Sequence, residues 1–513
     1  MKAERSAPYE GSMVRILQSP RNVWCEKPVT AFGLLVDGRD YYRAFYQAAL
    51  AAEEYIVMAG WQFDTDACLL RGDEARDAEL PVTLLAFLDA LCSRNQNLKI
   101  YLLAWDFHKI FALERQWLQE LRFTWLTSDR IQFIFDSKHH DDGAHHQKFV
   151  VIDGRLSFLG GLDLCDQRWD ERSHKDPNPL RDSRGEPHKP FHDVQAYLLG
   201  NEVAAELATL FAHRWQVAGG DPLSLRHLPA RAESYEPEGA VVLNAERVSL
   251  SRTDVLGSPN GRKNCREICD LHLDAIAAAQ RLIYVETQYF SSEELGKALV
   301  QRLRVADDST LEVVLVLNDK AETFKEEVAV GLAQAKVILD LRQAAEGTRH
   351  HLGIYYTVPE TEAGVEPERA TYIHSKLLIV DDRFLSVGSA NWTNRSTSVD
   401  TELNATVETE DPTDALATSI RRARQSLIAE HLGLPPSESE EIPGLVSDLD
   451  RLARERTSRL RLHPSPTEEE REALDVIDPQ QLPFDPSALE ARDEDKSIFV
   501  GGVSALWRRL TSR

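Results

Sequence analysis

One eight-residue pattern occurs twice in the chain and sets the plan of the fold. Residues 146–153 (HQKFVVID) and residues 374–381 (HSKLLIVD) both read H-x-K-x-x-x-x-D. Apolar segments of similar spacing follow one another in the same order around each copy. The equivalent histidines lie about 228 residues apart, far beyond the period of a solenoid repeat. The sequence therefore predicts an internal duplication that gives two similar lobes.

Hydrophobic periodicity predicts the same elements in both halves of the chain. In the first half we expect strands at 54–63, 98–106, 131–136, 146–153, 156–161 and 192–200, and helices at about 80–92 and 201–215. In the second half we expect strands at 282–290, 311–319, 352–358, 373–381, 384–391 and 403–411, and helices from about 293, from about 321 and at 415–429. Strands that are apolar on both faces and alternate with helices are typical of covered sheets. We therefore predict an α/β fold of two α/β/α sandwich lobes with an active site at the lobe interface.

Changes in composition place the domain boundaries. A polar stretch at 231–239 separates a first lobe, residues 1–235, from a second lobe, residues 236–434. Beyond it the chain becomes charged and is punctuated by prolines, which is typical of helices joined by linkers. Residues 435–513 are thus predicted to form a C-terminal appendage. Its final segment, residues 497–510, is expected to pack against the lobes rather than to serve as an amphipathic docking segment.

The charge balance bears on the partners of the protein. The chain has 513 residues, with 59 Lys and Arg against 83 Asp and Glu, a formal net charge of −24. Binding to nucleic acid and non-specific docking on anionic lipid both need clustered cations. We therefore expect no nucleic-acid partner, although individual pockets remain free to be basic.

The sequence also bears on location and redox state. No window holds the roughly 18 apolar residues of a membrane span, and the start, MKAERSAPYEGSMVRILQSP, lacks the apolar core of a signal peptide. We expect no transmembrane segment and a monomer in the cytoplasm or at the membrane periphery, with signal-independent export as an alternative. The six cysteines are scattered and are expected to be free thiols.

The two motifs carry the chemistry. In an extended strand, a histidine and a lysine two residues apart point the same way. Two imidazoles that face each other across an interface can act as nucleophile and acid, because imidazole titrates near the working pH. Lys148 and Lys376 would then hold the phosphoryl oxygens of a phosphodiester. Such a site needs no metal and no cofactor. The duplication favours a phosphate site over ordinary core or surface histidines.

The motifs and their surroundings resemble the phospholipase D superfamily. In the first half AHHQKFVVID, FLGGLDLCDQRWD, PFHDV and HRW are similar to the phosphatidylcholine-type phospholipases D, and in the second half VETQYF, IHSKLLIVDD and VGSANWTNRS are similar to them too. The resemblance covers about residues 50–430. It implies a phospholipase D that releases phosphatidic acid from glycerophospholipids at a membrane surface through a phosphohistidine, with transphosphatidylation.

The resemblance also implies roles for individual residues. His146 matches the usual nucleophile, and His374 the general acid that later becomes the base. Ser389 and Asn391 follow the second histidine at the family's spacing and would help to hold phosphate. Glu402 also matches, and we expect its carboxylate to orient the His374 ring, as a triad carboxylate does.

The first lobe departs from this pattern. It has Gly161 and Asp163 where the second lobe has serine and asparagine. A direct contact of Asp163 with phosphate is disfavoured because the carboxylate would repel the anion. For the carboxylate near His146 we expect Asp170, with Asp193 as the competitor.

Other polar residues near the motifs have competing interpretations. Asp153 and Asp381 complete the two motifs, but each leads into a turn, so a structural role is favoured over contact with substrate. His145, beside the first motif histidine, is expected to support it. The neighbouring segment 139–142 (HHDD) is interpreted as a polar loop rather than a metal site, because its spacing matches no familiar ligand set.

A third group of residues is expected near the pocket. Glu286 and Gln288 would rim it, with packing at the edge of the core as an equal alternative. The glycines of 160–161 and 388 would let the backbone approach closely there. Four aromatic side chains could line an apolar, cation-friendly headgroup pocket or pack in the core, namely Trp61, Tyr289, Tyr372 and Trp392.

Three alternative functions remain open from the sequence. A phosphatidyl transferase of the cardiolipin synthase kind uses the same chemistry with an alcohol as acceptor. An endonuclease of the superfamily is opposed by the net charge of −24. A non-catalytic lipid-binding member is disfavoured because both histidine and lysine pairs are intact.

Overall fold

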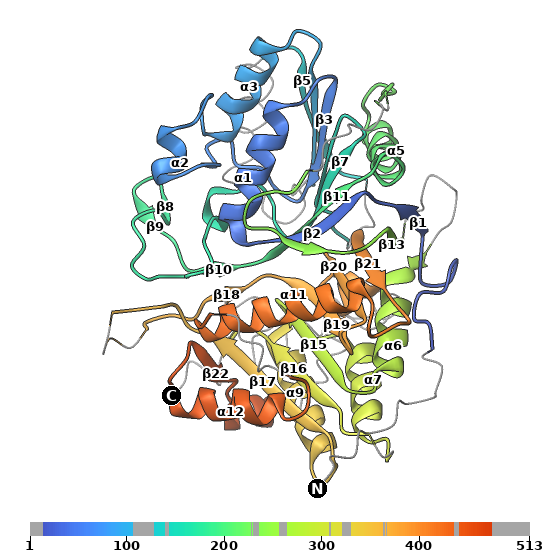
Figure 1. The fold of residues 1–513 in the computed structure, drawn as a ribbon, viewed down its shortest axis with the longest axis vertical. Helices are drawn as coiled ribbons and strands as arrows, with labels where there is room; N and C mark the ends of the chain where they lie inside the picture. Colours follow the sequence, from blue (N-terminus) through green and yellow to red (C-terminus); the bar gives the residue numbers. More distant parts are fainter. Residues whose placement is uncertain are drawn as a thin grey trace, which may run out of the picture.

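The computed structural model contains two α/β lobes stacked one above the other (Figure 1). The structure describes residues 14–105, 128–138, 143–226, 228, 235–255, 264–306, 309–320, 330–362, 365, 367–435 and 441–474. Among these, no helix is long and apolar enough to cross a membrane. The six cysteines are free thiols, as expected.

The first lobe is built on an eight-stranded sheet. Its strands, in spatial order, are β12 (Val241–Leu243), β2 (Ala31–Val36), β11 (Val194–Leu199), β7 (Leu156–Gly160), β6 (Phe149–Ile152), β3 (Tyr55–Gly60), β4 (Lys99–Trp105) and β5 (Ile131–Asp136). β3, β4 and β5 run parallel, and the other pairings are antiparallel. β3, β6 and β7 are buried along their whole length, which explains their continuous apolar sequences.

The second lobe repeats this plan in a ten-stranded sheet. Its path is β1 (Cys25–Pro28), β13 (Arg247–Asp254), β21 (Glu402–Glu408), β20 (Phe384–Gly388), β19 (Lys376–Val380), β15 (Leu282–Thr287), β16 (Glu312–Val316), β17 (His351–Thr357) and β22 (Leu460–Leu462), with β14 (Cys265–Arg266) paired to β13. Seven adjacent strands, β13 to β17 in this order, match β2 to β5 of the first sheet, including the parallel set at one edge. The predicted duplication and fold class are confirmed.

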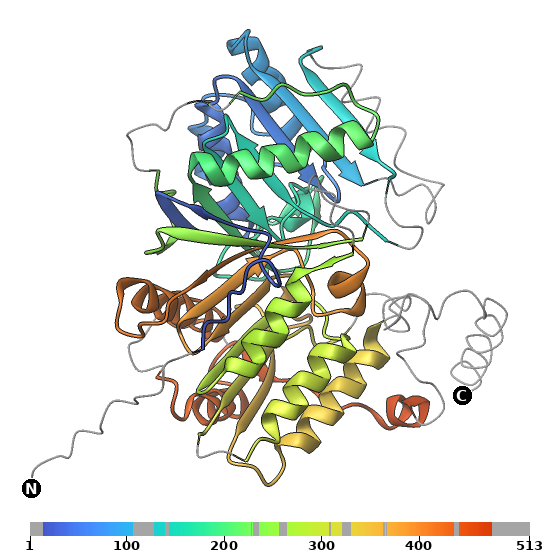
Figure 2. The ribbon, with the colours of Figure 1, turned by 90° about the vertical axis from the view of Figure 1, so that its right-hand side faces the viewer.

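Helices cover both faces of each sheet, as Figures 1 and 2 show. The first lobe contains α1 (Asp37–Leu50), α2 (Gly72–Arg76), α3 (Leu84–Arg94), the 3₁₀ turn η1 (Asp166–Arg168) and α5 (Asn201–Val217). The second contains α6 (Glu267–Ala278), α7 (Glu293–Leu303), α9 (Leu332–Ala345), α10 (Asn394–Ser398), α11 (Ala415–Leu432), α12 (Leu445–Glu455) and α13 (Glu468–Leu474). In α5, Val203, Leu207 and Leu210 recur at helical spacing and are buried against the sheet.

Three strands cross the predicted domain boundaries. β1 comes from the first segment of the chain but pairs with β13 of the second sheet. β12 comes after residue 235 but pairs with β2 of the first sheet. β22 lies in the predicted appendage and extends the second sheet beside β17. The domain boundaries at 235 and 434 stay a prediction. Strands from one side of each predicted boundary pair in the sheet on the other side. Residues 231–234 and 475–513, with the segment 497–510, lie outside the described residues.

The two motifs differ from the expected continuous strands. β6 begins at Phe149 and β19 at Lys376, so both motif histidines precede their strands. Their backbones are bonded instead to the opposite lobe: the N–H of His146 donates to the carbonyl of Thr401 at 3.0 Å, and that of His374 to the carbonyl of His192 at 2.8 Å. Next to the latter, β10 (Phe191–His192) and β18 (Tyr372–Ile373) pair in parallel across the interface (Figure 1). The lobe interface therefore ends each motif strand early.

Candidate active site

Each motif histidine is held by a carboxylate from the opposite lobe. Nδ1 of His146 lies 2.9 and 3.0 Å from the two carboxylate oxygens of Glu402. Nδ1 of His374 lies 2.5 Å from Oδ2 of Asp193. Glu402 begins β21 and Asp193 directly precedes β11, the equivalent strand of the first lobe. The two pairs are therefore related by the duplication, and both leave Nε2 of the imidazole for a substrate.

The expected pairing of carboxylates with histidines is wrong. Glu402 bonds His146 rather than His374, because the first motif is tied to the residue before Glu402 across the interface. Asp193 bonds His374, not the histidine for which it was the competitor. Asp170 is not near His146; its carboxylate pairs with Arg181 and accepts the N–H of Phe191. The prediction placed each carboxylate in the lobe of its own histidine, whereas the contacts cross between lobes.

Each motif lysine lies beside its own histidine. Nζ of Lys148 donates to the carbonyl of His146 at 3.1 Å, and Nζ of Lys376 donates to the carbonyl of His374. Both lysines are almost wholly buried. Lys148 also lies 3.6 Å from the carboxylate of Asp163. Two ammonium groups are thereby placed at the interface, one from each lobe.

Amide and hydroxyl side chains complete the second half of the site. Oε1 of Gln288 accepts from Lys376 and from Asn391, both at 3.4 Å. Oδ1 of Asn391 is buried with no hydrogen-bond partner among the described residues. Ser389 donates its hydroxyl to Glu402 at 2.5 Å. Ser389 thus positions the carboxylate that holds His146, and Asn391 keeps an unmatched polar group in the site.

Burial and nearby cations shift the protonation of the site. Burial, followed by Lys148 and Lys376, lowers the pKa of His146 well below its usual value. Burial lowers the pKa of His374 in the same way, with further contributions from Lys376, Arg168, Lys148 and His146. The charges of one lobe therefore act on the histidine of the other, so the two imidazoles share one site. Both rings are neutral near pH 7 until an anion enters.

The pKa values of the supporting carboxylates are raised, whereas that of Lys376 is lowered as for the histidines. Burial raises the pKa of Glu402 to about 7 and that of Asp193 to about 7. Burial lowers the pKa of Lys376 to about 7. Groups whose charges change near neutral pH inside a buried cluster are typical of catalytic sites. A bound phosphate would favour the protonated lysine and a protonated imidazole.

Comparisons with known proteins indicate the family of the chain. A family model described as "Cardiolipin synthase, PLD-like domain" matches residues 272–424. Phospholipase D alpha 1 of Oryza sativa subsp. japonica is 24% identical over 487 residues, which cover 71% of this chain and 60% of that protein. Phospholipase D alpha 3 of Arabidopsis thaliana is 23% identical over 572 residues, covering 85% and 69%. The chain belongs to the phospholipase D superfamily.

A solved structure supports the fold. The crystal structure of phosphatidylserine synthase from Haemophilus influenzae Rd KW20 matches with a TM-score of 0.51 at 15% identity, covering 85% of this chain and 96% of that one. This likeness concerns the fold alone. The chain also spans only about 60% of the length of the rice relative.

Glycines let the backbone approach neighbouring groups closely at the candidate site, as the sequence predicts. A Cβ at Gly161 would clash with the carboxylate of Asp193, which holds His374. A Cβ at Gly388 would clash with the side chain of Asn404 and the carbonyl of Leu403 on β21. The glycines thus let the strand that ends in the site pack against the strand that carries the carboxylate.

The motif aspartates have the structural role that the sequence favours and do not belong with the catalytic groups. Asp153 has φ 55° and Asp381 has φ 54°, a turn conformation that aspartate tolerates. The carboxylate of Asp381 accepts the N–H groups of residues 280, 281 and 282 at 2.7–2.9 Å. Asp153 accepts those of residues 53, 54 and 55 in the same way. Each aspartate ties the end of a motif strand to the start of the neighbouring strand.

Two further first-lobe residues support the site from behind. Oδ1 of Asp163 accepts the N–H of Trp61 at 2.8 Å, so this carboxylate fixes the end of β3 besides facing Lys148. Nδ1 of His145 lies 3.2 Å from the hydroxyl of Thr401, and Nε2 lies 3.1 Å from Asp136. The segment 139–142 lies outside the described residues.

Glu286 does not rim the pocket. It is fully buried and lies between His192, at 2.9 Å, and His431, at 3.0 Å, while Tyr284 donates its hydroxyl to it. These contacts lower the pKa of the Glu286 carboxyl despite its burial. Gln288, two residues along, does face the site through Lys376.

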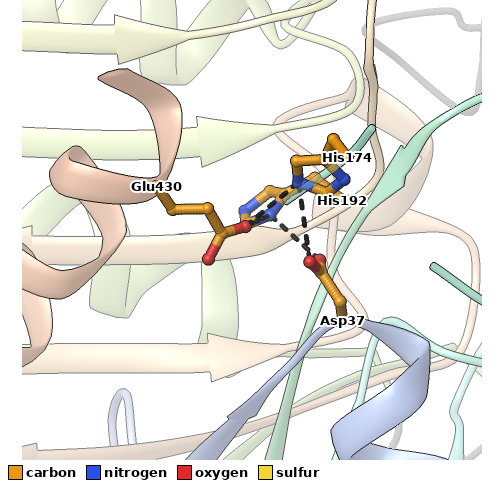
Figure 3. Close-up of side chains that lie close together, drawn as sticks. All are labelled: Asp37, His174, His192 and Glu430. Atoms are coloured by element: carbon orange, nitrogen blue, oxygen red, sulfur yellow. Dashed lines mark hydrogen bonds and ion pairs between the residues drawn. The ribbon is translucent and has the colours of Figure 1, made fainter. Parts of the chain in front are cut away.

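A second polar cluster, which the sequence prediction missed, joins four side chains (Figure 3). Asp37, His174, His192 and Glu430 are all buried, and their ligand atoms lie within 4.8 Å of one another. Its members come from four separate segments, so no local spacing marks it. Two carboxylates and two imidazoles form a donor set that can hold a divalent cation. With protonated imidazoles the same groups also balance their own charges, as the ion pairs between them indicate.

The aromatic residues do not form one pocket. Trp61 stacks on Trp105, with ring centroids 5.7 Å apart, and lies 6.3 Å from the ring of His146. Tyr372 lies 6.3 Å from His374 on the other side of the site and shares a hydroxyl contact with Tyr289. Trp392 packs in the core against residue 290 and lines neither side.

Proposed function

We propose that the protein is a phospholipase D-type enzyme that hydrolyses glycerophospholipids to phosphatidic acid and a free alcohol. The observation that carries this proposal is the pair of imidazoles, His146 and His374, each bonded at Nδ1 to a carboxylate of the opposite lobe. Lys148 and Lys376 stand beside them. Similarity to plant phospholipases D alpha supports a lipid substrate. The protein would act as a monomer at a membrane surface and would have no nucleic-acid partner.

In the first step Nε2 of His146 attacks phosphorus. A P–N bond forms, the bond between phosphorus and the headgroup oxygen breaks, and Nε2–H of His374 gives its proton to that oxygen. The bound anion supplies the negative charge that raises the pKa of His374 for this role. Glu402 stabilises the positive charge that develops on the His146 ring.

In the second step water resolves the intermediate. Nε2 of His374 takes a proton from water, the oxygen attacks phosphorus, and the P–N bond breaks to release phosphatidic acid and His146. The ammonium groups of Lys148 and Lys376 hold the phosphoryl oxygens, where charge accumulates in both transition states. Oδ1 of Asn391, which has no partner among the described residues, can accept a hydrogen bond from the substrate or from the attacking water.

A phosphatidyl transferase is the second candidate. An alcohol admitted in place of water would take the phosphatidyl group and give a new phosphodiester. The match of residues 272–424 to a model described for cardiolipin synthase favours this candidate. The same chemistry serves both functions, so the difference lies in which acceptor reaches the intermediate.

An endonuclease and a non-catalytic lipid-binding protein find less support. The net charge of −24 disfavours long-range attraction to nucleic acid. Both motifs retain histidine and lysine, which a binding protein does not need. Nicking of a plasmid, or lipid binding without turnover of any phosphodiester, would favour these alternatives.

Mass spectrometry of the products tests the proposal. The purified protein is incubated with mixed phospholipids, with and without ethanol or glycerol. We expect phosphatidic acid without alcohol and phosphatidylethanol with ethanol, and no product from His146→Ala. His351→Ala, which alters an exposed histidine of β17 outside the motifs, is the matched control and should be fully active. Phosphatidic acid release by His146→Ala would contradict the proposal, whereas transfer to glycerol that dominates over hydrolysis would favour the transferase.

A further inference from the structure

Arg168 places a cation beside the site, where its charge acts on His374. Its guanidinium carbon lies 5.0 Å from the ring centroid of Phe191. Within the part of the chain that the structure describes, its side chain makes no hydrogen bond and no ion pair. The residue is only partly buried. A planar guanidinium without a partner matches a carboxylate or phosphate oxygen pair.

A second cation lies along the same wall. Nζ of Lys189 is 3.1 Å from the ring centroid of Tyr372. The rings of Phe191 and Tyr372 are 5.6 Å apart, and one comes from each lobe. Arg168, Phe191, Tyr372 and Lys189 thus form a cationic wall in which each cation covers an aromatic face.

The cationic wall lies beside His374. The ring of Phe191 is 5.2 Å from that of His374, and the ring of Tyr372 is 6.3 Å away. Trp61, in contrast, lies beside His146. Under the proposed function His374 protonates the leaving oxygen, so the headgroup departs on the side of the cationic wall. In the proposed mechanism, the two motif lysines already bind the phosphoryl oxygens.

We propose that Arg168 and Lys189 are specificity residues that select a phospholipid whose headgroup carries a carboxylate, as serine does. This inference rests on the proposed function, which places the headgroup beside His374. The guanidinium of Arg168 would take the carboxylate in a forked pair of hydrogen bonds, and Lys189 would add a second positive charge. The wall would also reject choline, because a quaternary ammonium needs open aromatic faces, and here cations cover them.

A matched pair of lipids isolates the carboxylate. Phosphatidylserine and phosphatidylethanolamine differ in the headgroup only by that group. Short-chain forms below their micelle concentration avoid the surface potential of an anionic interface. kcat/KM is measured on both lipids for the wild type, Arg168→Gln, Lys189→Gln and the control Arg184→Gln. Arg184 is an exposed arginine of the same lobe, paired with Asp66 at the surface.

We expect the wild type to prefer phosphatidylserine by about 10- to 100-fold, the range of one charge-assisted hydrogen bond pair. Arg168→Gln should bring the preference close to one by lowering kcat/KM on phosphatidylserine more than on phosphatidylethanolamine, while any change through the pKa of His374 acts on both lipids alike. Lys189→Gln should lower the preference by a smaller factor, and Arg184→Gln should leave it unchanged. Equal losses on both lipids would place Arg168 in the phosphoryl cradle and overturn the proposal. A wild type that prefers ethanolamine would overturn it as well.

Failure of the proposed function has a different signature, namely no turnover of any phospholipid. Calorimetric binding of O-phospho-L-serine and O-phosphoethanolamine then tests the cationic wall without catalysis. The wall predicts tighter binding of phosphoserine by the wild type and equal binding of both by Arg168→Gln. Equal binding by the wild type would refute it. Arg168→Lys keeps the charge and should keep part of the preference for the serine headgroup. It is the control for a loss caused by misfolding.

Discussion

Glu402→Gln and Asp193→Asn should impair different steps, because each carboxylate serves a different histidine. Nδ1 of His146 lies 2.9 Å from Glu402, so the carboxylate faces the ring that becomes positive as it attacks phosphorus. At an effective dielectric of about 20, two unit charges about 4 Å apart attract by about 4 kcal/mol. Glutamine keeps the shape and removes this charge. We therefore expect attack by His146 to slow by about 10³-fold.

A phospholipid analogue with a nitrophenol leaving group separates the steps. Nitrophenolate is stable as an anion and needs no proton from His374, so the acid step ceases to matter. In stopped-flow measurements Asp193→Asn should release a rapid burst of one equivalent of nitrophenolate. Slow turnover should follow, because His374 is still needed to activate water. Glu402→Gln should show no burst, because the attack itself is impaired.

The control is Glu79→Gln, which alters an exposed glutamate paired with Arg94. It should match the wild type in burst and turnover. A burst from Glu402→Gln together with none from Asp193→Asn would mean that the histidines have exchanged roles. Identical burst and turnover of the two variants on the nitrophenol analogue would refute the argument that each carboxylate acts through its own histidine.

Three further predictions concern pH, packing and stability. The pKa of Lys376 is lowered to about 7 by burial, and the pKa values of Glu402 and Asp193 are raised to about 7. kcat/KM should therefore fall about tenfold per pH unit on the alkaline side of a maximum near pH 7, and up to about 100-fold per pH unit on the acid side, where both carboxylates become protonated. Lys376→Arg, whose charge persists, should flatten the alkaline limb of that profile. Gly161→Ala should displace the carboxylate of Asp193 and lower kcat at least about 10²-fold with an unchanged circular dichroism spectrum; wild-type kcat would show that the close approach is dispensable. Asp381→Asn should lose one of the carboxylate oxygens that hold residues 280–282 and lower the free energy of unfolding by about 1–3 kcal/mol in urea titrations, and a loss of activity per folded molecule would contradict its structural role.

Most strands made of apolar residues alone could be predicted from the sequence, although β2, which is also apolar, was missed. β3, β4 and β6 are buried and apolar, and their segments were found. β13 was missed because its buried residues include Ser249, Ser251 and Arg252. The guanidinium of Arg252 is matched by Glu267 inside the lobe, a contact that no local pattern reveals. Polar residues that meet only after folding hide a core strand.

The candidate site shows the same limit. The histidines and lysines could be found because their spacing is local and repeated. The partners of those histidines could not be assigned, because the contacts join residues 256 and 181 positions apart in the chain and cross the interface. The cluster of Asp37, His174, His192 and Glu430 was missed for the same reason. Spacing indicates which residue types recur, but not which lobe completes which half of the site.

The duplication also explains how two nearly identical halves can take different parts in one reaction. The backbone gives both histidines the same setting, with a lysine beside each and a carboxylate from across the interface. The difference comes from the residue seventeen positions after each histidine, Asp163 in one lobe and Asn391 in the other. Asp163 offsets the charge of Lys148, whereas Asn391 and Lys376 share the neutral Gln288. Burial, followed by nearby cations that include Lys376, lowers the pKa of His374 in the empty site, so under the proposed function it would depend on the substrate's negative charge for its proton. In the proposed mechanism, protonation of the acid would thereby be coupled to the arrival of a phosphodiester, while His146, bonded to Glu402, would be free to attack.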